Sequence, residues 1–82
     1  MVPITLQRFI KELEKIRQEL AAGTLLPENY DSRLARVIGE LRERGLDADR
    51  AAATAALAEA VTRGVITKDV QSHLENRLGL GG

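Results

Sequence analysis

The sequence predicts an all-α fold, a small up-and-down four-helix bundle built from two similar helical hairpins. Apolar residues recur at three- and four-residue steps, which is the spacing of one helix face. Single glycines fall where these patterns stop, as they do at helix ends. The apolar pattern also repeats after a shift of 40 residues, which implies two similar hairpins laid end to end. The matched positions are Leu6 with Leu46, Leu25 and Leu26 with Val65 and Ile66, Tyr30 with Val70, Leu34 with Leu74, Ile38 with Leu78 and Gly39 with Gly79.

The first predicted helix, residues 6–22, has the clearest pattern in the chain. Thr5 is placed to cap its N-terminus, and Ile4 can pack on Phe9 as a hydrophobic staple. Gly23 supplies the left-handed residue that ends the helix. One apolar stripe follows its length, formed by Phe9, Ile10, Leu13, Ile16 and Leu20.

The second predicted helix begins at Pro27, because the missing N–H of proline is harmless in a first turn. It continues to Arg44 and ends at Gly45. Together with the first helix it makes a hairpin of about residues 5–45.

The second hairpin, about residues 46–79, starts with a helix that is mostly alanine and has Asp47 as its predicted N-cap. Alanine favours helix and allows close packing of a neighbouring helix. The last helix starts after Thr67 and ends at Gly79. An aliphatic residue follows Gly45, Gly64 and Gly79, which predicts a Schellman motif at each. No strand is expected, because the aliphatic pairs beside helix ends are too short.

Composition predicts a single domain, residues 1–82, with a small hydrophobic core. The chain of 82 residues is 44% hydrophobic but only 2% aromatic, and it has no cysteine for disulfides or zinc. Its 12 basic and 12 acidic residues are evenly mixed, which counts against a nucleic-acid binder. No apolar run reaches the roughly 18 residues of a membrane span. We therefore expect a cytoplasmic protein that does not bind membranes.

Candidate chemistry centres on His73, the only histidine, with Asp69 one helical turn before it. A zinc site needs a third protein ligand, which the sequence does not supply nearby. An exposed pair of side chains is the favoured interpretation. Ser32 and Ser72 lack the Gly-x-Ser-x-Gly setting of a nucleophile. The sequence thus predicts no catalytic residue, metal, cofactor or small-molecule substrate, and no enzyme.

Residues 57–78 offer an alternative function, a small nucleic-acid-binding regulator. Ala60, Gly64 and Val70 fall at the small, turn and buried positions of a helix-turn-helix. However, His73 occupies a position where that motif has an aliphatic residue.

The terminal pair Gly81-Gly82 resembles the conjugation tail of ubiquitin-like proteins. Those proteins have a β-grasp fold, which an all-α chain does not provide. We expect a frayed chain end instead.

The function favoured by the sequence is a non-catalytic helical module for protein–protein interaction or oligomerisation. The first helix carries large apolar side chains, whereas the alanine-rich helix has little bulk to cover them, so part of the stripe is expected to stay exposed. The predicted interface residues are Phe9, Ile10, Leu13, Ile16 and Leu20. The expected partner is another protein or a second copy in a homo-oligomer. A closed monomeric bundle is the alternative.

Overall fold

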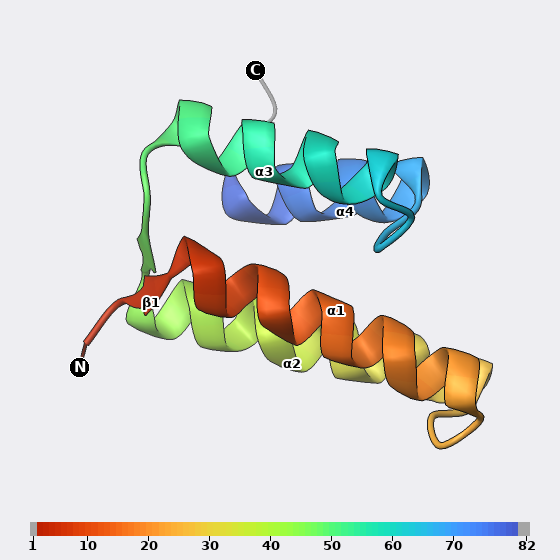
Figure 1. The fold of residues 1–82 in the computed structure, drawn as a ribbon. Coiled ribbons are helices and arrows are strands. Elements are labelled where there is room, and N and C mark those ends of the chain that lie inside the picture. The colour runs from red at the N-terminus through yellow and green to blue at the C-terminus, as the bar shows by residue number, and fades with distance from the viewer. Residues whose placement is uncertain (1, 81–82) are drawn as a thin grey trace.

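The computed structural model describes residues 2–80, in which four α-helices form two layers (Figure 1). One layer is the hairpin of α1 (Leu6–Ala22) and α2 (Pro27–Arg44), and the other is the hairpin of α3 (Arg50–Thr62) and α4 (Lys68–Leu78). Successive helices run in opposite directions. The predicted all-α four-helix bundle is confirmed. The end expected at Gly81 and Gly82 lies outside the described residues.

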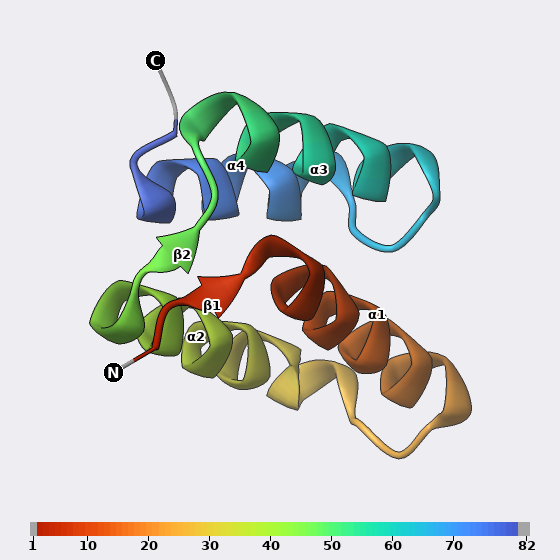
Figure 2. The same ribbon diagram turned by 60° about the vertical axis from the view of Figure 1, so that its left-hand side comes forward.

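The order of the helices around the bundle differs from their order in the chain. α1 packs on α2 and α3, and α4 packs on α2 and α3. The connection from α2 to α3 therefore crosses the bundle from one corner to the opposite one (Figure 2). As a result α2 and α4, which run in the same direction, are neighbours.

Two short strands join the hairpins, so the prediction of no strand is wrong. β1 (Ile4–Thr5) and β2 (Leu46–Asp47) pair in parallel, with Ile4 opposite Leu46. The amide of Ile4 also donates to the carbonyl of Gly45 at 2.9 Å. The reason is tertiary: the segments that precede α1 and α3 meet beside each other, and extended backbone satisfies its hydrogen bonds there.

The strand also corrects the predicted start of α3. Asp47 belongs to β2, and the N-cap is Asp49, whose carboxylate accepts a hydrogen bond from the amide of Ala52 at 2.7 Å. At the starts of α1 and α4 a threonine is the N-cap, and the prediction of Thr5 as the cap of α1 is confirmed. Thr5 accepts from the amide of Arg8, and Thr67 accepts from that of Val70, each at 3.2 Å.

The helix-end glycines have positive φ, as predicted, at Gly23, Gly45, Gly64 and Gly79. The predicted Schellman hydrogen bonds close at Gly64 and Gly79, where Val65 and Leu80 donate to the preceding helices. At Gly45 the prediction is wrong, because its ψ of 153° leads the chain into β2. The motif forms at Gly23 instead, although Thr24 follows it.

One cluster of buried residues contains side chains from all four helices. Ile4 and Phe9 of the predicted staple belong to it, together with Leu34, Leu57 and Leu74. Within residues 2–80, no helix is both long and apolar enough to cross a membrane.

Candidate functional site

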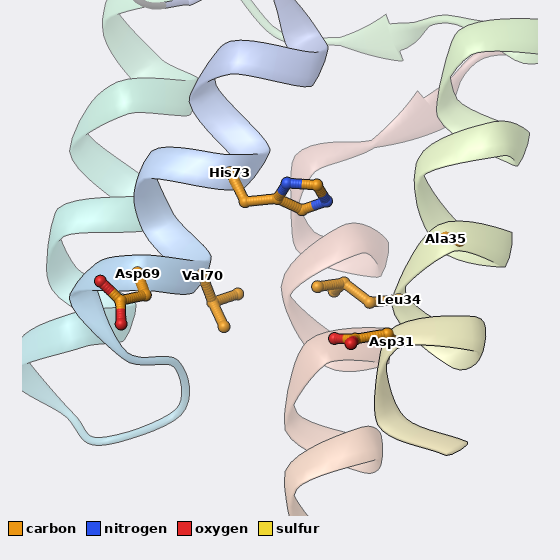
Figure 3. A pocket seen from close by; sticks show the side chains of 6 residues that line it. All are labelled: Asp31, Leu34, Ala35, Asp69, Val70 and His73. Carbon is orange, nitrogen blue, oxygen red and sulfur yellow. The ribbon is translucent and has the colours of Figure 1, made fainter. Parts of the chain in front are cut away.

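A groove runs along the surface between α2 and α4 (Figure 3). It consists of two adjoining hollows of about 510 and 250 Å³, and Ala35 and His73 line both. The residues that line this α2–α4 groove are Asp31, Leu34, Ala35, Ile38, Gly39 and Arg42 from α2 and Asp69, Val70, His73 and Arg77 from α4.

Helix periodicity and small side chains explain why the groove is open. The lining residues recur at three- and four-residue steps, which places them on one face of each helix. Leu34 is 3% exposed and forms the floor, whereas Ala35 and Gly39 are exposed and too short to fill the space above it. A Cβ placed on Gly39 meets nothing within 4 Å. His73 and Val70 project from α4 toward α2.

Charges are ordered along the groove. Asp31 and Asp69 lie at one end, and Arg42 and Arg77 lie at the other, with His73 between them. All four charged side chains are on exposed residues. In the described part of the chain the ion pairs involve other residues, namely Arg8 and Arg44 with Glu40, Arg33 with Glu19 and Arg63 with Glu14. The groove thus has an acidic end and a basic end, neither neutralised by an ion pair from within residues 2–80.

A third hollow of about 350 Å³ continues the groove at its acidic end, where it shares Val70. Its walls are mostly apolar and include Leu20, Tyr30 and Ile66. Burial raises the pKa of the Tyr30 phenol, and the charge of Asp31 raises it further. The phenol therefore stays protonated at neutral pH and can donate a hydrogen bond.

The structure buries most of the predicted interface stripe. Phe9, Leu13 and Ile16 are at most 2% exposed, while Ile10 and Leu20 are half-buried. An interface on this stripe is therefore limited to Ile10 and Leu20.

The alanine-rich helix covers more of the stripe than its small side chains suggested, although Ile10 and Leu20 stay half-buried. Ala53 and Ala60 are each 1% exposed, and α3 packs against α1. The reason is that small side chains let the two helices approach closely.

His73 and Asp69 are both exposed, but they do not form an ion pair. Within residues 2–80, no group of three or more histidine, cysteine, aspartate or glutamate residues is placed to hold a metal ion. The sequence interpretation of these two residues was an exposed pair, with a metal site as the alternative, and it did not include a groove. The available signal was the spacing of Asp69, His73 and Arg77, which puts an acid, a histidine and a base on successive turns of α4.

The segment proposed as a helix-turn-helix forms an ordinary hairpin. α3 and α4 run side by side in opposite directions in both views (Figures 1 and 2). Arg63 is paired with Glu14 at 3.3 Å, and Arg50 donates to the carbonyl of Gly79 at 2.6 Å. These two arginines of the hairpin, which could contact a phosphate, are therefore engaged within the chain.

Comparisons with protein-family models, curated proteins and solved structures found no match for this chain. Function has to be inferred from the groove itself.

Proposed function

We propose that this chain is a cytoplasmic, non-catalytic helical module that binds another polypeptide in its α2–α4 groove. The observation that supports the proposal is the groove itself, an open surface hollow with an apolar floor and with opposite charges at its two ends. Helix-in-groove binding uses this kind of surface, because apolar side chains of the partner fill the hollow while charges fix its direction.

Energetics favour a partner that contacts the groove along its length. One apolar side chain that becomes fully buried contributes about 1.5 to 3 kcal/mol, whereas association costs at least about 4 kcal/mol. A partner that fills only one hollow therefore gains too little free energy from burial to offset the cost of association. A segment that spans the apolar third hollow beside Tyr30 and the groove as far as Arg77 can place several side chains.

The structure adds no observation in favour of the nucleic-acid alternative. Asp69 and Glu75 lie among the basic residues of α4, so no continuous positive ridge forms there. Nucleic-acid affinity depends mainly on such a ridge.

Site-specific photocrosslinking in the source cells tests the proposal. A benzoylphenylalanine replaces Ala35 in the groove or, as the matched control, Ala55, an exposed alanine on α3. We expect an adduct of defined mass from position 35 and none from position 55. The adduct should disappear when Gly39→Trp fills the groove. Equal labelling from both positions, or an adduct that Gly39→Trp leaves intact, would contradict the proposal.

A further inference from the structure

We infer that the partner is a second copy of this chain, joined antiparallel so that the two α2–α4 grooves face each other. This inference rests on the proposed function and names its partner. The argument comes from the order of charges along the groove, which makes the surface complementary to itself.

The two charged residues of α4 that line the groove are placed symmetrically about His73. Asp69 lies four residues before it and Arg77 four residues after it, and all three line the groove. Consider a two-fold axis that lies between the two copies, in the plane of their contact, and runs at right angles to the helices. It places Asp69 opposite Arg77 of the second copy. The same axis places His73 opposite His73 of the second copy.

The two charged residues of α2 that line the groove follow the same symmetry. Asp31 and Arg42 are separated by about 16 Å of helix, at 1.5 Å per residue, and Asp69 and Arg77 by about 12 Å. The axis that pairs the two α4 helices also brings Asp31 opposite Arg42 of the second copy. Ala35 and Gly39 lie near the midpoint of α2, where short side chains permit the closest approach of the two copies.

The opposite orientation is disfavoured by the same charges. A two-fold axis parallel to the helices would place the acidic end of one copy on the acidic end of the other. Like charges in such contacts oppose binding. The chain as a whole has a formal net charge of zero, so two copies meet without overall repulsion. An interface of this kind is isologous, which is the commonest form of homodimer.

Exchange of the two groove charges of α2, at positions 31 and 42, tests the inference. We expect Asp31→Arg to weaken the dimer at least about ten-fold, because it places like charges opposite each other at two symmetric positions. The added change Arg42→Asp should restore dimerisation, because the new basic side chain at position 31 then lies opposite a new acidic side chain at position 42 of the second copy. Glu59→Arg on α3 changes the net charge equally and should leave the dimer intact. Sedimentation equilibrium measures the association, and circular dichroism checks that each variant folds.

A single cysteine tests the symmetry independently of the charges. The chain contains no cysteine, so His73→Cys creates one thiol per copy. Mild oxidation should link two copies through position 73, which lies at the axis. Ser72→Cys is the control, because its side chain points about 100° away around the helix. Equal crosslinking of the two variants, or none from His73→Cys, would overturn the antiparallel arrangement.

The outcomes separate this inference from the proposed function. A purified chain that stays monomeric at millimolar concentration overturns the homodimer. If position 35 still gives its specific adduct with a different protein in cells, the groove remains a binding site and only the partner is wrong. If that adduct is also missing, both proposals fail.

Discussion

The two hairpins share a topology, but their first helices, α1 and α3, bury side chains of different size. The second helices match after the 40-residue shift, since Leu34 and Leu74 are both buried. The first helices do not, because the shift places Asp49 opposite the buried Phe9 and Ala56 opposite the buried Ile16. α1 fills the interior with large side chains, whereas α3 uses alanines that bring its backbone closer. A repeated pattern thus predicts topology better than it predicts packing.

The largest expected effect comes from Leu57, the one large side chain that α3 buries completely. Leu57→Ala should lower the free energy of unfolding by about 2 to 5 kcal/mol, because it leaves a cavity that neighbouring alanines cannot fill. Urea denaturation measures the loss. Leu26→Ala is the control, since Leu26 is 51% exposed and should change stability by less than about 0.5 kcal/mol. Similar losses from both variants would show that α3 does not depend on this side chain.

Overpacking tests whether α3 needs its small residues. Ala60 is 1% exposed, so Ala60→Leu should cost about 1 to 3 kcal/mol by forcing α3 away from its neighbours. Ala58→Leu, at an exposed position of the same helix, should have little effect on the midpoint of urea denaturation. A stabilising Ala60→Leu would mean that space remains beside α3.

Gly39 inside α2 and Gly45 just after its end give opposite predictions. Gly45→Ala should destabilise the fold by about 1 to 2 kcal/mol, because φ is 85° and ψ is 153°, a conformation nearly exclusive to glycine. Gly39→Ala should stabilise it by about 0.5 to 1 kcal/mol, since Gly39 lies inside the helix and its new Cβ meets open space. Thermal denaturation distinguishes the two. A raised melting temperature for Gly45→Ala would show that the chain does not require this turn into β2.

Sequence reasoning found the elements whose causes are local. The bounds of α1 and α2 and the start of α4 after Thr67 follow from periodicity, glycine and capping chemistry within a few residues. β1 and β2 were missed because each has two residues and forms only when the hairpins meet. The groove was missed for the same reason: it exists only because α2 and α4 become neighbours, which no local pattern in the sequence indicates.

The smallest expected effect concerns the ion pair that joins the two helices of the first hairpin. Arg33 donates two hydrogen bonds to Glu19, at 2.9 and 3.1 Å. The second hairpin is joined differently, through the bond from Arg50 to the carbonyl of Gly79. The bonds from Arg33 hold the pKa of Glu19 below its usual value of 4.5, and they raise the pKa of Arg33, which stays charged.

A carboxylate whose pKa is lowered by folding stabilises the fold at a pH above its pKa in the unfolded chain. This contribution disappears as the pH falls through its pKa in the folded chain. Arg33→Met should therefore lower the melting temperature slightly at pH 7, and its difference from the wild type should vanish at a pH well below 4.5. Because both side chains are partly exposed, solvent screening keeps the effect small. Arg36→Met, an exposed position on the same helix that forms no ion pair with the described residues, controls for the loss of one positive charge. If the melting temperatures of the wild type and Arg33→Met differ by the same amount at both pH values, the ion pair is not the source of that difference.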